Sequence, residues 1–375
     1  MDAVEKLARG AVAGGDVQEV LFGTYTRRES RGIYHAVLDR AHGRVSAPEL
    51  LLALDDPTYL CADGAGGILA VAKSAVRGVA EGGLVRAALE RGLSGGPAGD
   101  DGLGGIVGAR VTGSCFAPGP NPCYVSADAS RGLAFSANYH VPVAESYVLG
   151  AEGSIARADS DERTGGGGPR PEQRDGAHLH FAGTTPDGRL AVVDLGSDTL
   201  LTYDVDDDGS MHLADTLSLP AGFGPRHLAF SPDGSRAYLA AELSNQLAVL
   251  GYDERGGTFS PLSFASTLPA GFDGWSAAAA VRVSGDGRFV YVSNRGHDSI
   301  AVFAIEGDAV SPVQFASTAG SFPRDFALDV TGRFLLVAHQ KSDGATLFSR
   351  DEETGELTEL QRDIPVPEGV CVLFL

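Results

Sequence analysis

The chain has 375 residues, of which 43% are hydrophobic and 21% are charged, and its formal net charge is -20. This composition is typical of a packed globular protein, and no stretch approaches the roughly 20 apolar residues that a membrane span needs. The negative charge argues against nucleic-acid binding, which relies on basic surfaces that neutralise phosphates. We therefore expect a protein that binds neither membranes nor nucleic acid.

The N-terminal segment predicts a cytoplasmic location. Asp2, Glu5 and Lys6 interrupt residues 1–17, so this segment lacks the continuous apolar core of a secretory signal. The cysteines show no paired metal spacing and are expected to stay reduced in such a compartment; they are Cys61, Cys115, Cys123 and Cys371. We expect neither a metal nor another cofactor.

A repeated pattern runs along the chain. Each unit has an apolar strand, a turn of the Asp-Gly type, an alternating strand, a short polar loop and another alternating strand. The turn glycines Gly188, Gly234, Gly287 and Gly332 place successive units about 45 to 53 residues apart. Alternation with a period of two predicts strands, and the turns predict tight hairpins. Repeats of this kind are typical of four-stranded β-propeller blades.

Seven segments have the form of the second strand of such a unit: residues 18–26, 66–74, 132–140, 188–196, 234–242, 287–295 and 332–340. An innermost strand precedes each of them except the first, and the C-terminal PEGVCVLFL has the form of the missing one. We therefore predict an all-β, seven-bladed propeller with four-stranded antiparallel blades, formed by residues 1–375 as one domain. Residues 370–374 should pair beside residues 20–25 and close the ring, which removes an unpaired edge.

Two glycine-rich tracts interrupt the pattern, at residues 92–105 and 163–176. Their composition cannot offset the entropy of ordering by burying apolar surface. We expect both tracts to be exposed loops.

One end of the predicted ring gathers polar side chains. In an antiparallel hairpin the start of the innermost strand lies beside the end of the second strand, so these positions meet at one mouth of the channel in every blade. They hold six of the nine histidines and several arginines, which suits a small anionic ligand. The positions are Tyr25, Lys73, Tyr124, Asn138, His140, His178, His180, Arg226, His227, Glu242, Asn294, Arg295, His297, Arg324, Asp325, His339 and Gln340.

Glu242 is the only glutamate at this mouth, and the strand register brings Arg226 within reach of it. A carboxylate in such apolar surroundings is expected to pair with an arginine. The pair has two interpretations, a catalytic one and a purely structural one.

Several segments resemble the lactonase family of seven-bladed propellers, which includes bacterial 6-phosphogluconolactonases and fungal carboxymuconate cyclases. The similarity extends over essentially the whole chain. It is strongest in the segments GTYT at residues 23–26, GFGPRHLAFSPDGSRAYLAAEL at 222–243, GRFVYVSNRGHDSIAVF at 287–303 and FPRDFALDVTGRFLLVAHQKSD at 322–343.

The resemblance implies a histidine, an arginine and a glutamate as the active-site set, matched here by His178, Arg226 and Glu242. Lactone hydrolysis needs a base, an oxyanion partner and a clamp for the anion. We assign His178 as the base, Arg226 as the partner of the oxyanion and of the carboxylate, and Glu242 as the residue that orients Arg226 or His178. The expected substrate-binding residues are His180, His227, Asn294, Arg295, Arg324, His339, Gln340, Tyr25 and Asn138, with Arg295 and Arg324 as the distal clamp.

Three functions therefore stay open. The first is hydrolysis of a small anionic sugar lactone, as in 6-phosphogluconolactonases. The second is lactone formation from a muconate, in which the same residues would serve a cycloisomerase acting on a polycarboxylate. The third is a non-catalytic propeller that binds a ligand or a protein, because a fold does not determine function. We expect the protein to be a monomer.

Overall fold

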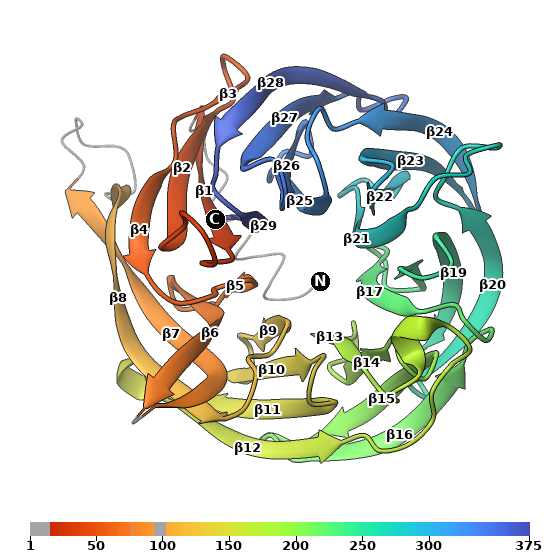
Figure 1. Ribbon diagram of the computed structural model, residues 1–375, viewed down its shortest axis with the longest axis horizontal. Helices are drawn as coiled ribbons and strands as arrows, with labels where there is room; N and C mark the ends of the chain where they lie inside the picture. The colour runs from red at the N-terminus through yellow and green to blue at the C-terminus, as the bar shows by residue number, and fades with distance from the viewer. Residues whose placement is uncertain (1–15, 77, 94–102) are drawn as a thin grey trace.

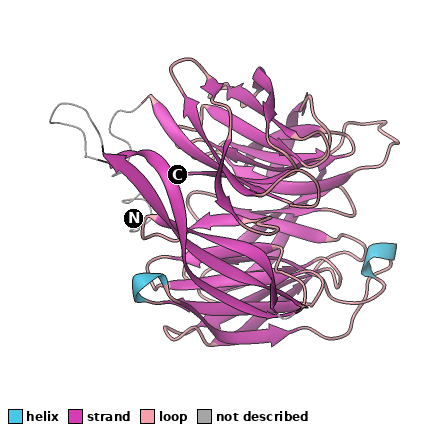
Figure 2. Ribbon diagram, turned by 60° about the vertical axis from the view of Figure 1, so that its left-hand side comes forward, coloured by secondary structure: helices cyan, strands magenta, loops and turns pink. Residues whose placement is uncertain are grey.

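The computed structural model describes residues 16–76, 78–93 and 103–375, which form a ring of seven antiparallel sheets (Figure 1). Each sheet is one blade of a β-propeller, and its strands follow one another from the central channel outward. Strands make up nearly all of the regular structure in Figure 2, together with two single helical turns, Ala151–Gly153 and Pro171–Gln173. Within the described residues, no helix is long and apolar enough to cross a membrane.

The blades contain the strands that the repeat predicts. The innermost strands are β29 (Gly369–Phe374), β5 (Leu60–Ala62), β9 (Tyr124–Asp128), β13 (Leu179–Thr184), β17 (Pro225–Phe230), β21 (Ala277–Val283) and β25 (Pro323–Leu328). The second strands are β1 (Val17–Thr24), β6 (Gly67–Val76), β10 (Leu133–Asn138), β14 (Leu190–Asp194), β18 (Arg236–Ala241), β22 (Phe289–Arg295) and β26 (Phe334–His339).

The two outer positions of each blade complete the four-stranded sheets. The third strands are β2 (Gly32–Asp39), β7 (Val79–Leu93), β11 (Val143–Leu149), β15 (Thr199–Val205), β19 (Gln246–Asp253), β23 (Ser299–Glu306) and β27 (Gly344–Arg350). The outer strands are β8 (Leu103–Pro118), β12 (Ile155–Glu162), β16 (Met211–Ser218), β20 (Thr258–Ser266), β24 (Ala309–Ser317) and β28 (Leu357–Pro365), and in the first blade β3 (Arg44–Val45) with β4 (Glu49–Ala53).

The apolar core lies between neighbouring blades. In β1, Val20 and Phe22 pack in one cluster with Leu336 of β26, whereas Leu21 packs in another cluster with Leu69 of β6. Successive side chains of a strand point to opposite faces of its sheet, and each face here is covered by an adjoining blade. This packing explains why the inner strands are apolar on both faces.

The turn glycines have the backbone conformation that the repeat predicts. Gly188, Gly234, Gly287 and Gly332 have φ values of 86°, 73°, 69° and 69°. Residues with side chains rarely adopt this left-handed region, so glycine allows the tight turn between the first two strands of these blades.

The two ends of the chain share the first blade. β29 pairs antiparallel with β1, with Val20 opposite Phe374 and Thr24 opposite Gly369. The backbone N–H of Leu375 donates a hydrogen bond of 3.0 Å to the carbonyl oxygen of Glu19. The predicted closure of the ring is therefore confirmed, and no innermost strand is missing from the circle.

The glycine-rich tracts differ in part from the exposed loops that we predicted. In the first tract β7 continues to Leu93 and β8 begins at Leu103, so both ends are strands, and residues 94–102 lie outside the described residues. The second tract is mostly exposed, but Gln173 is completely buried. Its Nε2 donates hydrogen bonds to the carbonyl oxygen of Leu195 at 2.8 Å and to Asp198 Oδ1 at 2.7 Å. These internal partners allow a polar side chain to be buried where composition suggested only exposure.

Ring closure predicts a specific loss of stability. Removing the last eight residues should abolish cooperative unfolding, because β1 would lose β29 and keep only β2 as its partner. Val372→Asp should lower the free energy of unfolding by about 2–5 kcal/mol, because it buries a carboxylate in the apolar cluster around Phe22. Leu360→Asp, at a position that is 44% exposed on β28, is the matched control. Urea denaturation measures both effects, and a truncated chain that unfolds like the full one would contradict the closure.

Candidate active site

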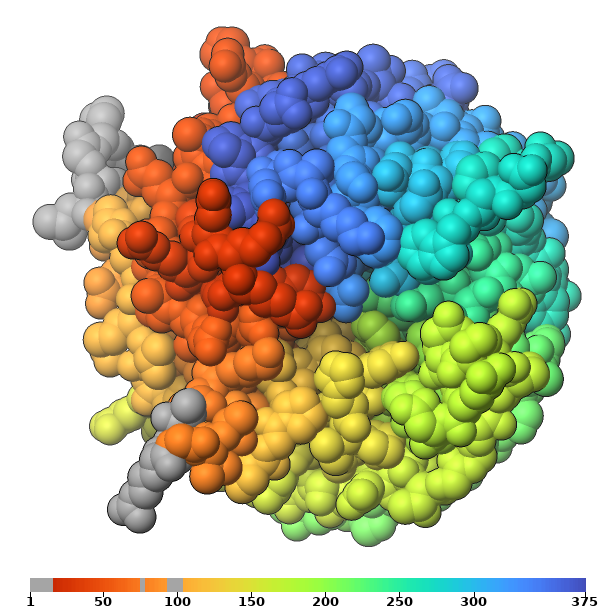
Figure 3. Space-filling model, in the orientation of Figure 1, coloured from red at the N-terminus to blue at the C-terminus, as the bar shows by residue number. Residues whose placement is uncertain are grey.

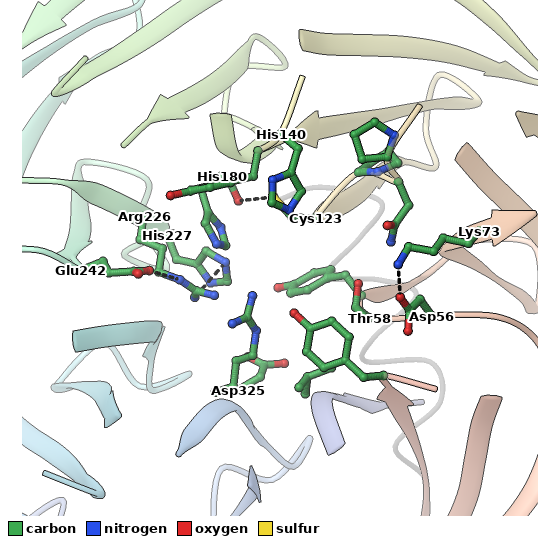
Figure 4. Close-up of a pocket in the computed structure, with 18 of the residues that line it drawn as sticks. Asp56, Thr58, Lys73, Cys123, His140, His180, Arg226, His227, Glu242 and Asp325 are labelled. Atoms are coloured by element: carbon green, nitrogen blue, oxygen red, sulfur yellow. Dashed lines mark hydrogen bonds and ion pairs between the residues drawn. The ribbon is translucent and has the colours of Figure 1, made fainter. Parts of the chain in front are cut away.

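A pocket of about 420 Å³ opens at the predicted channel mouth. The surface of the ring is hollowed near its centre in the space-filling view (Figure 3), and the residues that line the pocket converge from several blades (Figure 4). Seven of the residues predicted for the site line this pocket: Tyr25, His180, Arg226, His227, Glu242, Arg295 and Arg324.

β-Bulges in the innermost strands supply four of the lining residues. The pairing of β13 with β14 skips His180, that of β17 with β18 skips Arg226, and that of β25 with β26 skips Arg324. The pairing of β1 with β29 skips Val370 in the same way. A bulge takes one residue out of the regular alternation and redirects its side chain. The recurrence of this irregularity brings side chains from four blades to one pocket.

Glu242 links two arginines at the pocket wall. Its Oε2 lies 2.9 Å from Arg226 Nε and 2.7 Å from Arg295 Nη2. The pair with Arg226 that the sequence predicted is present, although the N–H of Arg226 Nε does not point directly at the carboxylate. Arg295 is also held by the backbone, since its Nε donates to the carbonyl oxygen of Ala277 at 3.2 Å. The Glu242 carboxylate therefore links Arg226 to Arg295, whose position is fixed by the backbone.

The charges of this group follow from burial and proximity. Burial raises the pKa of Glu242, but the positive charges of Arg295, Arg226 and Arg324 lower it by a larger amount. The pKa therefore lies below its usual value. Burial, together with Arg295 and Arg324, lowers the pKa of Arg226 to about 9. At neutral pH the carboxyl is therefore ionised and the guanidinium keeps its charge.

The two buried histidines of the pocket, His180 and His227, are neutral at pH 7. Burial, reinforced by the charge of Arg226, lowers the pKa of both His180 and His227 well below 6.5. The positive charge of the channel mouth therefore comes from arginine and lysine side chains, and these two imidazoles do not add to it.

The hydrogen bonds of His227 define its tautomer. Its Nε2 lies 3.3 Å from Arg226 Nη1. Because a guanidinium can only donate, Nε2 must accept, and the neutral ring carries its proton on Nδ1. His180 differs, since neither of its ring nitrogens forms a hydrogen bond within the part of the chain that the structure describes. Of the two buried imidazoles, His180 is therefore the one with a nitrogen free to act as a base.

His178, which the sequence assigned as the base, does not line the pocket. Its Nδ1 lies 2.8 Å from the carbonyl oxygen of Tyr139, and its Nε2 lies 3.2 Å from Asp175 Oδ1. Its ring stacks on that of Tyr139, with the ring centroids 4.3 Å apart. Tyr139 lines the pocket, and His178 packs against Tyr139 without lining the pocket itself.

Two predicted asparagines also lie outside the lining, where they bind backbone groups. Asn138 Nδ2 donates to the carbonyl oxygen of Pro120 at 2.8 Å, and Asn294 Nδ2 donates to that of Thr267 at 2.7 Å. Both side chains hold loops at the ends of second strands.

His339 and Gln340 likewise lie outside the lining. His339 is buried, and its Nδ1 lies 3.2 Å from the carbonyl oxygen of Gly344. Gln340 Oε1 accepts a long hydrogen bond of 3.5 Å from Arg324 Nη1, so it contacts a pocket residue from outside. Arg324 has no carboxylate partner among the described residues and remains available to a ligand.

The floor of the pocket is a polar and aromatic layer across the channel. Tyr59 and Tyr124 have their ring centroids 4.2 Å apart, and the ring of His227 meets both edge-on. Asp325 Oδ1 accepts a hydrogen bond of 2.9 Å from Arg282 Nη2 beside them. A second hollow, lined by Tyr59, Tyr124 and Arg282, lies on the other side of this layer. A ligand therefore reaches the site from the mouth.

The sequence analysis missed several lining residues. Lys73, His140 and Asp325 were placed at the mouth but not among the ligand-binding residues, and Arg27, Asp56 and Tyr139 were not indicated at all. Arg27 and Asp56 lie on loops beyond the strand ends, where strand periodicity carries no information. Among the residues that the structure describes, no group of three or more His, Cys, Asp or Glu side chains is arranged to hold a metal ion.

Comparison with known proteins places these features in a family. The family model "Lactonase, 7-bladed beta-propeller" matches residues 19–374. A 6-phosphogluconolactonase of Bacillus subtilis is 36% identical over 365 residues, which cover 94% of this chain and 97% of that protein. An uncharacterised protein of Lactococcus lactis is 38% identical over 96% of this chain and 99% of its own length.

Solved structures agree with the sequence comparison. A protein from Lactobacillus plantarum is similar with a TM-score of 0.86 at 43% identity, over 96% of this chain and 99% of that one. The periplasmic gluconolactonase of Pseudomonas aeruginosa has a TM-score of 0.83 at 30% identity, with the same coverage of 96% and 99%. The match over nearly the whole chain, in sequence and in structure, means that this chain belongs to the lactonase family of seven-bladed β-propellers.

Proposed function

We propose that the chain hydrolyses a small anionic sugar lactone, of the 6-phosphogluconolactone kind, in the pocket at the channel mouth. The observation that carries this proposal is a neutral, unpaired imidazole, His180, in the same pocket as the charged group of Arg226, Glu242 and Arg295. The similarity to the Bacillus subtilis 6-phosphogluconolactonase supports the choice of substrate.

The first step is attack by water on the carbonyl carbon of the lactone. His180 takes a proton from the water as the new carbon–oxygen bond forms, because its low pKa leaves the ring unprotonated at neutral pH. The carbonyl oxygen becomes an oxyanion, and Arg226 and Arg324 supply positive charge to stabilise it.

The second step opens the ring. The tetrahedral intermediate collapses, and the bond between the carbonyl carbon and the ring oxygen breaks. The protonated His180 returns its proton to the leaving oxygen, which becomes a hydroxyl group, and the product is an open-chain hydroxy acid. His180 is then neutral again and ready for another cycle.

Glu242 and Arg295 act as positioning residues in this scheme. Glu242 Oε2 is shared between the two guanidinium groups, so Arg226 is held in place before the substrate arrives. Such preorganisation lowers the barrier, because no reorientation is needed when charge develops on the substrate.

The protonation states favour hydrolysis over lactone formation from a muconate. A cycloisomerase must deliver a proton to carbon from an acid. At neutral pH His180 and His227 are unprotonated, and Glu242 is ionised, so none of these three groups holds a proton suited to that role.

Substrate turnover tests the proposal directly. The protein should hydrolyse 6-phosphogluconolactone well above the rate in buffer and should not convert 3-carboxymuconate. Conversion of the muconate alone would assign the cycloisomerase activity. Absence of turnover with both compounds, together with recovery of a protein partner, would instead favour a non-catalytic propeller.

His180 and His178 can be separated by matched substitutions. His180→Gln should lower kcat by about 10²–10⁴-fold, the usual effect of removing a general base. His178→Gln should have a much smaller effect, because His178 does not line the pocket and stacks on Tyr139, which does. Steady-state kinetics measure both, and a larger loss for His178→Gln would return the role of base to His178.

Glu242→Gln separates a catalytic role from a structural one. Removal of this charge leaves Arg226 and Arg295 without a countercharge, which should lower the free energy of unfolding by about 3–5 kcal/mol. Misplacement of Arg226 should also lower kcat by up to about 100-fold, with a smaller change in KM. Glu242→Asp, which keeps the charge, should recover part of the activity. A destabilised Glu242→Gln protein with normal kcat would show that the group is structural.

A further inference from the structure

The pocket has a second cationic wall, formed by Arg27 and Lys73 from the first two blades. Figure 4 shows Lys73 and Asp56 on one side of the pocket and Arg226, His227 and Glu242 on the other. Arg27 and Lys73 have no role in the mechanism described above, and neither has Asp56, which pairs with Lys73. The pocket therefore holds positive charge in two separate places.

The second wall is organised around Asp56. This side chain is almost fully buried, its Oδ2 forms an ion pair with Lys73 Nζ, and its Oδ1 accepts a hydrogen bond of 2.9 Å from the backbone N–H of Thr26. Asp56 has a φ of 47°, in the left-handed region that aspartate and asparagine adopt more readily than other side chains. Asp56 therefore holds both Lys73 and Thr26, the residue before Arg27, at this wall.

Arg27 is oriented by an aromatic ring. Its Cζ lies 4.0 Å from the ring centroid of Tyr25, and Arg324 Cζ lies 5.8 Å from the same centroid. Arg27 has no carboxylate within ion-pair distance in the described part of the chain, whereas its neighbour Arg28 pairs with Asp343 at 2.7 Å. Arg27 is therefore an exposed cation that lies over the Tyr25 ring and is available to an anion.

We propose that Arg27 and Lys73 bind the phosphoryl group of the substrate and so select phosphorylated over unphosphorylated sugar lactones. This inference rests on the proposed lactonase function. In a 6-phosphorylated lactone the phosphoryl group is on an exocyclic carbon, separated from the reacting carbonyl by the ring oxygen and two carbons. With the carbonyl at His180 and Arg226, the phosphoryl group needs a second cationic site, and a pair of cations suits its double charge.

The test compares two lactones that differ only in the phosphoryl group. For Arg27→Gln, kcat/KM for 6-phosphogluconolactone should fall by about 10- to 100-fold, the range for loss of a charge-assisted hydrogen bond. The value for glucono-1,5-lactone should change by less than about threefold, since this substrate has no such contact. Arg28→Gln is the matched control and should leave the ratio of the two values unchanged.

Lys73 requires a variant that keeps Asp56 compensated, because Lys73→Gln alone would leave a buried carboxylate without its partner. The double variant Lys73→Gln/Asp56→Asn removes both charges and should lose selectivity, whereas Lys73→Arg should retain most of it. Unfolding in urea must show that each variant is folded at the assay temperature. A folded double variant that still prefers the phosphorylated lactone would overturn the role of Lys73.

The outcomes separate this inference from the function on which it rests. If the protein hydrolyses both lactones and Arg27→Gln lowers both values equally, or changes neither, the phosphate site is wrong and the lactonase proposal stands. If the protein hydrolyses neither lactone, the lactonase proposal fails, and calorimetry with 6-phosphogluconate and gluconate decides the phosphate site alone. Binding of 6-phosphogluconate that is weakened in Arg27→Gln supports the site, and equal binding of both acids overturns it.

Discussion

The pairing of β29 with β1 is the constraint on which the rest of this structure depends. A propeller blade buries its two faces only against its neighbours, so a ring with one open joint would expose apolar surface on two blades. The closing strand also reaches the candidate site. Val370 lines the pocket, and the backbone N–H of Val372 donates a hydrogen bond of 3.0 Å to Asp325 Oδ2 on the pocket floor. The geometry of the site is therefore coupled to the joining of the chain ends.

The Glu242 carboxylate organises the charge on one side of the pocket. Glu242 pairs with Arg226 and Arg295, and without it these guanidinium groups would repel each other in a site of low polarity. Burial, reinforced by the same positive charges, keeps the nearby imidazoles of His180 and His227 neutral. An acidic chain thus builds a local site with a permanent positive charge and an unprotonated base, a combination that suits attack of water on the carbonyl of an anionic lactone.

The inner-strand bulges explain how a repeated scaffold acquires a specific site. In regular strands, the side chains of His180, Arg226 and Arg324 would follow the alternation between the two faces of the sheet. The bulge at each of these residues instead redirects the side chain toward the shared channel. The blades therefore repeat a local irregularity as well as a strand pattern. Substitution at a bulged position can change the ligand chemistry while leaving the ladder that supports the blade intact.

By itself, the sequence determined the seven blades, the positive-φ turn glycines, the closing strand and the ion pair of Arg226 with Glu242. All of these depend on local periodicity or on hairpin register, and both can be read from the order of residues along the chain. The tertiary structure decided that His180 and not His178 lines the pocket. It also decided that Glu242 pairs with Arg295 as well as with Arg226, and that Arg27 of the first blade and Lys73 of the second blade line the same wall. Bulges, loop conformations and contacts between blades set these positions, and such features depend on packing between segments far apart in the chain.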